Sequence, residues 1–576
     1  MACKTFKYAL TFVDVTSRYE EADPLATQEA KEVASALEKI YKRSLLEWPN
    51  QLQVDPGLEV MVVTGLELWI VCLNRVNVGQ STGIVDYTTS VCRRLGETYP
   101  QEDDLKNDYP LLDINDTVHA ANSKVVMLNS TQVFEVGDSI VFNVIVRDGN
   151  RNRRKKGGDI IRLWLESEHT ELTSMIGTVV DNRNGTYTAA VKLFIPGVFH
   201  VKAMVTYSRE SVRARYRSHR LGSGPYYFRG TFKHGSVSTT TYCDPLSSAL
   251  SGNPVCNITS RNYGMPFFCG RPTESNLSCE HWSGSKTLVY TNPTLPLTEM
   301  ERTLLDRAHT WQYIPTAIVV VVKEGESRPD ELPDCQSLDK QRLWEQRSPV
   351  GFFKNGSYFN VMCGVDHDIN RYRQCMKGRR LYFFGDSLSR QMYVTYNRIM
   401  CGANLHWPPQ DLHKPKKYIN SAHNLTSSWV VHSMPFHSAI EITKFNKGIS
   451  ELLEDIGPHE DAVVVISHHT HLLVYHHSVF EERMEIYRRV IKAFFSRNSR
   501  AVIFIKGMGT WEGNMQRDSC FVELYNNIMR CALSGISQRL IFLDHNDIGV
   551  LSKNRDLHPG EFVVREYVLN MLGFIC

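Results

Sequence analysis

Residues 379–390 read RRLYFFGDSLSR, and this stretch decides how the C-terminal half of the chain folds. The apolar run from Leu381 to Phe384 is typical of a short buried strand, and it ends at Gly385. Apolar side chains then recur at helical spacing, at Leu388, Met392, Tyr393, Tyr396 and Ile399. A strand that ends at a glycine and leads into a helix places Asp386 and Ser387 at the carboxyl edge of a sheet, where α/β folds bind ligands.

The serines of this stretch allow two interpretations. A serine at the start of a helix has its hydroxyl beside free backbone N–H groups, which can stabilise an oxyanion. Ser387 or Ser389 could equally cap the helix and carry no chemistry. Because Gly-Asp-Ser alone is a weak motif, the choice depends on whether the chain also supplies a histidine base.

Downstream of this stretch, strand-like and helix-like patterns alternate. Apolar runs predict strands at Leu381 to Phe384, Ser428 to His432, Ala462 to Ile466, Ala501 to Ile505 and Leu540 to Leu543. Helical patterns lie between them at Leu388 to Met400, Phe445 to Ile456, Ser478 to Phe495 and Ser519 to Leu533. This order predicts a mostly parallel sheet with helices on both faces, in an α/β domain over residues 335–576.

A candidate base lies near the C-terminus, in the stretch NRDLHPG from Asn554 to Gly560. The stretch follows the last predicted strand, so His558 is expected at the same sheet edge as Ser387. A serine becomes a nucleophile when a base takes its proton, and the base needs an acceptor to fix its tautomer. Asp556 and Asp544 compete for that orienting role. A Ser–His dyad is a third option, and Asp556 could be a turn residue only.

Residues 119–220 have the shorter period of β-structure. Short β-rich runs lie at Ser123 to Thr131, Ser139 to Asp148, Ile160 to Ser167, Thr178 to Asp181, Thr186 to Phe194 and Val198 to Ser208. Turn-forming pairs such as Asp148-Gly149 and Pro196-Gly197 separate them. This density of short strands predicts a β-sandwich of immunoglobulin type.

The remaining segments are less regular. Residues 221–334 are rich in cysteine, glycine and aromatic residues, which predicts a disulfide-stapled connector with one strand at Thr316 to Val322. Residues 1–118 form an N-terminal segment without an assigned fold. Within it, Leu25 to Leu46 is helix-like, and Leu58 to Leu73 is an apolar stretch that we expect to be a core element.

Several of these stretches together resemble the neurexophilin and PC-esterase domain (NXPE) family. The sandwich region contains VGDSIVFNVIVRDG from Val136, KKGGD from Lys155, NGTY from Asn184 and GVFHVKAMV from Gly197. The cysteine-bearing stretch from Cys243 to Trp282 fits the linker of that family. The resemblance covers residues 119–576. It implies a neurexophilin-like, filamin-type β-sandwich followed by a PC-esterase domain of the SGNH/GDSL type, with a flavodoxin-like three-layer fold.

The resemblance also implies roles for the candidate residues. Ser387 would be the nucleophile and His558 the base, in the chain order that SGNH hydrolases use. In those families the acid usually stands three residues before the histidine. Here that position is Arg555, and Asp556 lies only two residues before His558. Asp544 is therefore a rival for the role of the acid.

The same resemblance implies an oxyanion hole. Its first donor would be the backbone N–H of Ser387, directly after the turn at Gly385. The second would lie on the loop after the third strand, where SGNH enzymes carry G-x-N-D and PC-esterases a G-x-H variant. This chain has neither motif there, which leaves His468 or His469 as the donor.

Arg390 follows the serine by three residues, as in plant glycan O-acetyltransferases of the same superfamily. A cation there could stabilise an oxyanion or anchor an acidic sugar. It could equally form a structural ion pair with Asp386 at helical spacing.

Net charge, cysteines and glycosylation sequons bear on the partners, the metal content and the compartment of the protein. The 576 residues carry a net charge of +3, which gives no argument for a nucleic acid partner. The 14 cysteines include no C-x-x-C pair, so disulfides are expected and a metal site is not. N-glycosylation sequons occur at Asn115, Asn129, Asn184, Asn257, Asn276, Asn355 and Asn424. Cysteines and sequons together predict the secretory pathway, either secretion or the Golgi lumen.

Two features of the N-terminal segment bear on that prediction. The start, MACKTFKYALTFVDV, has no uninterrupted apolar core and no cleavage signal, which suggests an incomplete or atypical N-terminus. The stretch from Leu58 to Leu73 contains Glu59 and Glu67 and falls short of the ~20 residues of a membrane helix, so no stable span is expected.

The sequence and the resemblance together predict a serine-dependent O-acetyl esterase or O-acetyltransferase that acts on glycans or glycoproteins, such as sialylated chains. No cofactor is expected, apart from acetyl-CoA as the acyl donor if the protein is a transferase. The alternative is a catalytically decayed secreted glycoprotein that binds a cell-surface receptor as neurexophilin does.

Overall fold

The computed structural model describes two strand pairs near the N-terminus and most of residues 111–576. Within the second range it does not describe residues 112, 130, 132, 221–225, 251–253, 290–297, 305, 307–308, 326–331, 347–348, 409–412, 437–445, 512–518, 534–535 and 537–538. The chain divides into two compact units, Met1–Ile84 and Val85–Cys576, and each is described by itself.

The first unit contains two β-hairpins. Strand β1 (Tyr8–Val13) pairs with β2 (Glu20–Leu25), and β3 (Val60–Thr64) pairs with β4 (Glu67–Val71), both antiparallel. The apolar stretch at Leu58 to Leu73 is thus mainly β-structure. The predicted helix over residues 25–46 lies outside the described residues, apart from Leu25 at the end of β2.

The second unit begins with a β-sandwich. One sheet has the order β10-β11-β7-β5, and the other has the order β21-β20-β9-β8-β12-β19-β6, with β18 also paired to β12. The first sheet consists of β5 (Lys124–Met127), β7 (Ser139–Ile145), β10 (Thr178–Asp181) and β11 (Thr186–Lys192). The second consists of β6 (Val133–Glu135), β8 (Ile160–Ser167), β9 (Ser174–Ile176), β12 (Gly197–Tyr207), β18 (Gln312–Ile314), β19 (Val319–Lys323), β20 (Gly351–Lys354) and β21 (Ser357–Asn360).

Buried and more exposed side chains alternate along the strands, which explains why the two sheets pack face to face. On β7, Ile140, Phe142 and Val144 are fully buried, and the residues between them are more exposed. They share one core with Leu163 and Leu165 of β8, in the opposite sheet. The sandwich is therefore held by the inward faces of both sheets.

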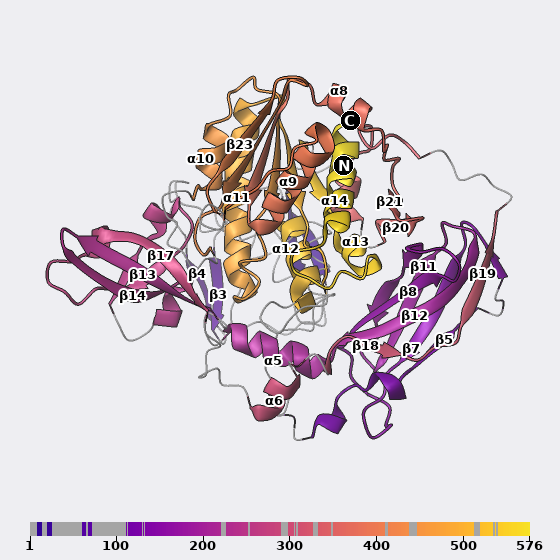
Figure 1. The fold of residues 1–576 in the computed structure, drawn as a ribbon. Helices are drawn as coiled ribbons and strands as arrows, with labels where there is room; N and C mark the ends of the chain where they lie inside the picture. The colour runs from indigo at the N-terminus through magenta and orange to yellow at the C-terminus, as the bar shows by residue number, and fades with distance from the viewer. Residues whose placement is uncertain are drawn as a thin grey trace, which may run out of the picture. The chain divides into compact units, whose positions relative to one another are not determined.

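The strands of the second sheet come from all three predicted segments, residues 119–220, 221–334 and 335–576. The strand expected at Thr316 to Val322 is β19, which pairs antiparallel with β12 and parallel with β6. The hairpin β20–β21 comes after residue 335 and yet extends the same sheet through β9. The sandwich is thus continuous with the regions on either side of the predicted connector (Figure 1).

The cysteine-rich segment forms a sheet of its own, with the order β15-β16-β14-β13-β17. Its strands are β13 (Tyr226–His234), β14 (Val237–Asp244), β15 (Val255–Asn257), β16 (Phe268–Gly270) and β17 (Trp282–Val289). Disulfides Cys243–Cys269 and Cys256–Cys279 fasten it. Helix α5 (Arg209–Arg220) leads from the sandwich to this sheet. The predicted disulfide-stapled connector is therefore mainly β-structure.

The C-terminal region contains a six-stranded sheet with the order β23-β24-β22-β25-β26-β27. Its strands are β22 (Arg380–Gly385), β23 (Lys416–Asn420), β24 (Leu425–Val431), β25 (Ala462–Ser467), β26 (Val502–Lys506) and β27 (Leu540–Leu543). All neighbours pair in parallel except the edge strand β23. Numbered along the chain, the parallel strands have the order 2-1-3-4-5, as in flavodoxin-type sheets.

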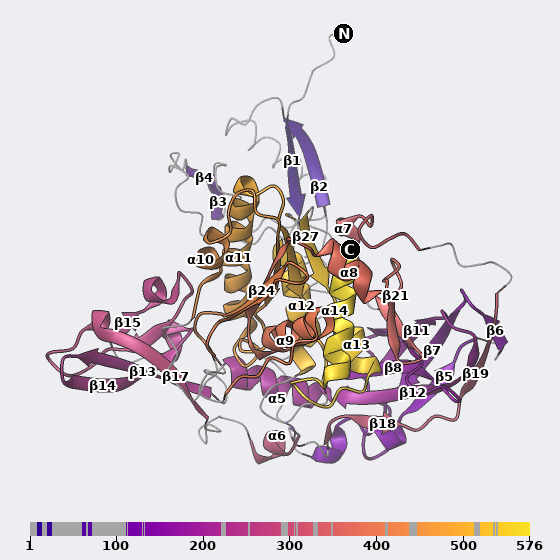
Figure 2. The same ribbon diagram turned by 45° about the horizontal axis from the view of Figure 1, so that its top comes forward.

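Helices cover both faces of this sheet (Figure 2). They are α9 (Ser387–Cys401), α10 (Ile449–Glu454), α11 (His477–Arg497), α12 (Val522–Leu533), α13 (Asn546–Leu551) and α14 (Glu561–Ile575). Right-handed crossovers place α9 on one face and α10 to α12 on the other, because the chain reverses direction after β24. Helix α9 packs against α14, and α11 packs against α12.

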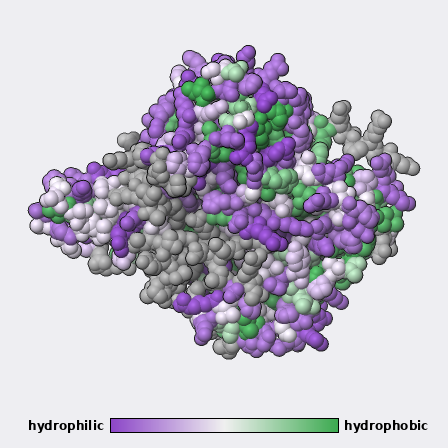
Figure 3. Space-filling model, in the orientation of Figure 1, coloured by the Kyte–Doolittle hydropathy of each residue, from purple (hydrophilic) through white to green (hydrophobic). Residues whose placement is uncertain are grey.

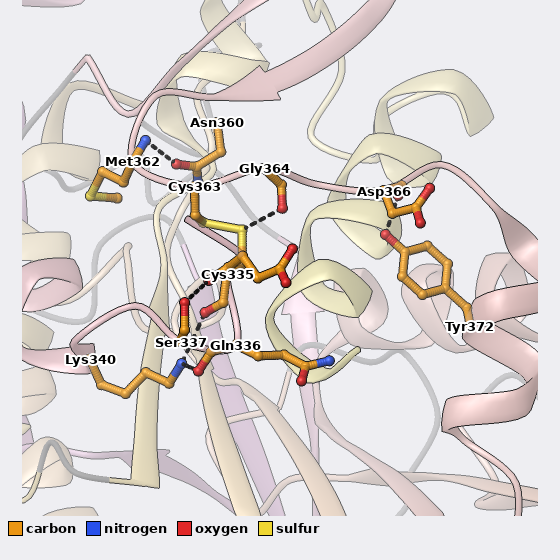
Figure 4. Close-up of a disulfide and its surroundings, with 11 residues drawn as sticks. Cys335, Gln336, Ser337, Lys340, Asn360, Met362, Cys363, Gly364, Asp366 and Tyr372 are labelled. Carbon is orange, nitrogen blue, oxygen red and sulfur yellow. Dashed lines mark hydrogen bonds between the residues drawn. A yellow bond between two sulfur atoms is a disulfide. The ribbon is translucent and has the colours of Figure 1, made fainter. Parts of the chain in front are cut away.

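Two disulfides whose cysteines are both described fasten this region. Cys335–Cys363 joins the segment before α7 (Lys340–Glu345) to the segment after β21, and Lys340 donates hydrogen bonds to the Cys335 and Gln336 carbonyls beside it (Figure 4). Cys375–Cys576 joins the end of α8 (Ile369–Cys375) to the last residue of the chain. The expectation of disulfides is confirmed for these cysteines.

On the face drawn in Figure 3, hydrophilic residues predominate and hydrophobic ones form small groups. Among the described helices, none is both long enough and apolar enough to cross a bilayer.

Candidate active site

The turn between β22 and α9 is fixed by a close approach of two backbones. Gly385 has a φ of +141°, and a Cβ on it would lie 1.8 Å from the carbonyl oxygen of Ser467, at the end of β25. The next residue, Asp386, donates its backbone N–H to that carbonyl over 3.1 Å. Since β22 and β25 flank the point where the strand order reverses, Ser387 lies at the topological switch point of the sheet.

The side chain that caps helix α9 is that of Asp386, not that of Ser387 or Ser389. Its Oδ1 accepts hydrogen bonds from the backbone N–H groups of Leu388 at 2.9 Å and Ser389 at 3.4 Å. The Ser389 hydroxyl donates to the Asp386 carbonyl and accepts from the Trp429 indole. The alternative that Ser387 or Ser389 caps the helix is therefore wrong, and the Ser387 hydroxyl is not used in capping.

Ser387 and His558 are in contact across 171 residues of sequence. The Ser387 Oγ lies 2.6 Å from the His558 Nε2. The loop that carries His558 is held against α9, because the Gln391 side chain donates to the Pro559 carbonyl over 3.0 Å. Glu561, in the first turn of α14, forms an ion pair with Arg398 of α9. Packing of α9 against α14 therefore sets the distance between the two side chains.

The two aspartates weighed as orienting acids have other surroundings. Asp556 is exposed, and its backbone N–H and carbonyl both bond to the Asn554 side chain. Asp544 accepts from Arg530 at 2.9 Å and from the Asn546 backbone at 3.0 Å. Among the described residues, neither carboxylate hydrogen-bonds to the His558 ring.

The loop after β25 carries buried histidines. His468 bonds through Nδ1 to the Tyr487 hydroxyl on α11, and its ring lies 3.8 Å from that of His432. His469 contacts the hydroxyls of Ser467 at 3.4 Å and Thr470 at 3.0 Å. Burial, first of all, lowers the pKa of both rings well below the usual value, so both are neutral.

Two buried ionisable side chains near the candidate nucleophile interact electrostatically. Asp386 and Lys506, the last residue of β26, are both almost completely inaccessible to solvent. Burial lowers the pKa of Lys506 to about 8, and the charge of Asp386 opposes that shift. Burial likewise raises the pKa of Asp386, and Lys506 opposes it.

An aromatic pair lies beside this lysine. The Lys506 ammonium lies 5.0 Å from the centre of the Tyr567 ring, and His545 stacks on that ring at 4.2 Å. Sequence reasoning missed Lys506, His545 and Tyr567. The only signal was a lysine at the end of the apolar run VIFIK.

A cationic and aromatic wall lies one helical turn beyond Ser387. The guanidinium of Arg390 lies 5.6 Å from the centre of the Trp429 ring, and Trp407 contacts Trp429 edge-on at 6.0 Å. Burial lowers the pKa of Arg390, and Asp386 opposes that shift. Burial and, next, the charge of Arg390 lower the pKa of His413 to about 4, so His413 is neutral and Arg390 supplies the positive charge.

The histidines that follow β25 have separate partners. His471 bonds to His432 at 2.9 Å, and His477 bonds to Glu481 at 2.8 Å. In the part of the chain that is described, no group of three or more His, Cys, Asp or Glu side chains has the geometry of a metal site.

The predicted glycosylation sites lie at accessible positions. Six of the seven asparagines are exposed, namely Asn115, Asn184, Asn257, Asn276, Asn355 and Asn424. Asn129 is half-buried, and its side-chain oxygen accepts a hydrogen bond from the Val141 backbone.

Residues 358–576, which contain both Ser387 and His558, match the family described as "NXPE family member 4-like, C-terminal domain". The C-terminal region of the chain, residues 358–576, therefore belongs to the NXPE family. This agrees with the resemblance found in the sequence.

Two solved structures are similar to parts of this chain. The Lin-41 filamin domain is 18% identical, and the match covers 16% of this chain and 82% of that one, with a TM-score of 0.13. Invasin, a bacterial integrin-binding protein, is 14% identical, with 45% and 50% covered and a TM-score of 0.13. Scores this low carry no argument about function.

Proposed function

We propose that this protein is a serine-dependent O-acyl esterase or O-acetyltransferase of the SGNH type, and that it acts on glycans or glycoproteins. One observation carries the proposal, the 2.6 Å contact between Ser387 Oγ and His558 Nε2 at the switch point of a parallel sheet. A serine with a purely structural role does not need a histidine within hydrogen-bonding distance. A serine nucleophile does need one, because the histidine takes the hydroxyl proton.

The proposed reaction has two steps. The Ser387 oxygen attacks the carbonyl carbon of an acetyl ester, and His558 Nε2 takes the hydroxyl proton. His558 then gives this proton to the leaving alcohol, and the acetyl group stays on Ser387. A second hydroxyl, from a sugar or from water, attacks the acyl-enzyme and loses its proton to His558. The Ser387 ester bond breaks, and the serine takes the proton back from His558.

Backbone groups stabilise the oxyanion in this proposal. The Asp386 carboxylate binds the N–H groups of Leu388 and Ser389 and leaves that of Ser387 to the oxyanion. The N-terminal end of α9, 15 residues long, adds its dipole. His468 and His469, both buried and neutral, support the loop after β25 and do not supply charge.

Arg390 is the residue proposed to select the substrate. It is a partly exposed cation one turn after the nucleophile, stacked on Trp429. Arginine binds carboxylates in a two-pronged geometry, which suits an acidic sugar such as sialic acid. If the second hydroxyl belongs to a sugar, the enzyme is a transferase. Acetyl-CoA is then its proposed acyl donor, and its thiol takes the proton from His558 and leaves in place of the alcohol.

The compartment proposed is the secretory pathway, either the Golgi lumen or the exterior of the cell. The support is that four disulfides join pairs of described cysteines, as is typical of proteins from oxidising compartments, and that six sequon asparagines are exposed.

A second candidate function is a decayed enzyme that binds a cell-surface receptor. The observation in its favour is that neither Asp556 nor Asp544 hydrogen-bonds to His558, so the sequence-derived acid is not in place. Incubation of the purified protein with an O-acetylated sialoside, and separately with acetyl-CoA and the unacetylated sialoside, distinguishes the two. Release or transfer of acetate that disappears in Ser387→Ala supports the enzyme, and equal rates in both proteins support the binding protein.

A further inference from the structure

A strongly basic segment joins strands β7 and β8 of the sandwich, both labelled in Figure 1. Residues 147–156 read RDGNRNRRKK and contain six cationic side chains and one acid, Asp148. The whole chain of 576 residues has a net charge of only +3, so positive charge is concentrated in this segment. Charge of one sign that gathers in one place produces a local potential that attracts ions of the opposite sign.

The fold holds this segment as a hairpin. Arg147 and Arg153 face each other across an antiparallel bridge, and Arg154 donates its backbone N–H to the Val146 carbonyl over 3.2 Å. The Arg147 guanidinium donates to the Arg151 carbonyl over 2.7 Å and so fixes the turn. Like charges directly opposite each other in a pair of strands are destabilising. A turn that only joined two strands would gain stability from almost any other pair at these two positions.

A neighbouring loop adds a further cation. Gly185 approaches the hairpin so closely that a Cβ on it would lie 2.1 Å from the Arg154 carbonyl oxygen. Asp181 ties the two loops together, because its Oδ1 accepts the Arg183 backbone N–H at 2.7 Å and its Oδ2 accepts that of Gly158 at 2.6 Å. The exposed cations of both loops are called the basic surface. They are Arg151, Arg153, Lys155, Lys156 and Arg183.

Three of these cations are available to an outside partner. The side chains of Arg151, Arg153 and Lys155 are exposed, and none of them forms a hydrogen bond or an ion pair with another described residue. Asp148, the acid within the segment, accepts the Asn152 backbone N–H over 2.8 Å and so helps to hold the turn. The local acid is thus engaged with the backbone, and these three cations face solvent.

Two of the arginines occupy an unfavourable backbone conformation. Arg151 has a φ of 68° and Arg183 a φ of 60°, in the left-handed region that glycine and asparagine adopt more readily. One such arginine lies in each of the two adjoining loops. Residues held in this region at a cost in backbone energy are common at binding sites.

We propose that the basic surface binds a sulfated polysaccharide of the kind found outside cells. Such a chain carries sulfate groups at intervals, and the planar guanidinium of arginine donates two N–H groups to one oxyanion. Exposed cations spread over two adjoining loops, rather than gathered in one enclosed pocket, suit a long anionic chain.

Two other classes of polyanion fit the basic surface less well. Residues 147–158 contain no apolar side chain, whereas a segment that binds in the interface of an anionic membrane presents apolar residues beside its cations. They also contain no aromatic ring on which a nucleic acid base could stack. The four disulfides between described cysteines are typical of proteins outside the cytosol, where sulfated polysaccharides are the abundant polyanions. The choice of this class rests on the proposed compartment and not on the proposed chemistry at Ser387.

Calorimetric titration of the full chain with a sulfated heparin fragment tests the site. The N-glycans are first trimmed to their innermost sugar, because Asn184 lies in the second loop and the Asn115 carbonyl accepts the Gly149 N–H of the hairpin over 2.7 Å. A triple variant with Arg151→Gln, Arg153→Gln and Lys155→Gln should weaken binding at least tenfold. The plot of log affinity against log salt concentration should also become less steep, by about 2.

A second triple variant is the matched control. Arg489→Gln, Lys492→Gln and Arg500→Gln remove the same charge from three exposed cations on and after α11. This variant should bind the heparin fragment within about twofold of the parent. Because all six side chains are exposed, both triple variants are expected to keep the melting temperature of the parent.

Each outcome decides one claim. Equal losses of affinity in the two triple variants, or no binding of the heparin fragment by the parent, would overturn the site. Tighter binding to phosphatidylserine vesicles or to single-stranded DNA than to heparin would overturn the ligand class. Ser387→Ala should bind heparin as the parent does. Failure of the proposed acetyl chemistry therefore leaves this site intact, and failure of heparin binding leaves the proposed enzyme intact.

Discussion

Gly385 and Ser467 approach each other so closely that no side chain fits between them, and this approach positions the nucleophile. A Cβ at residue 385 would lie 1.8 Å from the Ser467 carbonyl oxygen, and the φ of +141° suits glycine alone. The strain of that φ alone costs about 1–3 kcal/mol for another residue, and the clash adds to it.

Gly385→Ala should therefore displace Ser387 and lower the thermal stability. We expect acetyl release or transfer to fall at least a hundredfold, with a reduced melting temperature. Gly457→Ala is the matched control, because the nearest atom to a Cβ there lies at 3.9 Å. Full activity in Gly385→Ala would contradict the described turn.

The buried pair Asp386 and Lys506 should show energetic coupling. Lys506→Met leaves the Asp386 charge buried without its opposite charge, and Asp386→Asn does the same to Lys506. The double variant removes both charges, so it should be more stable than the sum of the single effects predicts by about 0.5–3 kcal/mol. Urea unfolding of the four proteins measures this coupling, and additive effects would refute it.

Stability of the sandwich should depend on pH through Asp159. Burial, first of all, raises its pKa from 3.8 to about 6, the charge of Glu210 adds to the shift, and Arg154 opposes it. Because the folded-state pKa is raised, the stabilisation is complete below about pH 4 and is lost as the pH rises through 6.

Asp159→Asn tests that dependence. The amide oxygen can still accept the Arg209 N–H, which Asp159 now binds at 2.8 Å. The melting temperature of the parent should fall more steeply between pH 4.5 and 7 than that of the variant. Parallel curves for the two proteins would show that Asp159 does not titrate in this range.

The disulfide between Cys375 and Cys576 should stabilise the C-terminal region. It closes a loop of 201 residues, and loss of such a bond typically costs about 2–5 kcal/mol. The double variant Cys375→Ser, Cys576→Ser should unfold at lower urea concentration. Cys401→Ser is the control, because Cys401 is a free thiol. Equal midpoints in the double variant and the control would contradict a stabilising bond.

Local pattern was enough to predict the elements that carry the candidate site. The apolar run ending at Gly385 predicted β22 and α9, and the stretch from Asn554 to Gly560 predicted the loop where His558 meets Ser387. The structure confirms these elements because residues that are close together in sequence determine the periods of strands and helices. The geometry of parallel sheets then places the ends of the strands at one edge.

Features that depend on distant contacts could not be predicted in this way. Lys506 ends an apolar strand, and nothing beside it in sequence shows that it interacts electrostatically with Asp386. The same holds for β20, whose partner β9 lies some 175 residues earlier in the chain. The partner of Asp544 is a further example, because Arg530 lies on α12 and its contact with Asp544 is not visible in the sequence around either residue.

The proposed function depends most on whether Ser387 is a nucleophile that His558 activates. Treatment with a fluorophosphonate, followed by peptide mass spectrometry, measures this directly. We predict that Ser387 alone is modified, and that His558→Ala lowers the rate at least a hundredfold while the fold is kept. Lack of modification of Ser387 in the folded parent protein, or an equal rate in His558→Ala, would contradict the account.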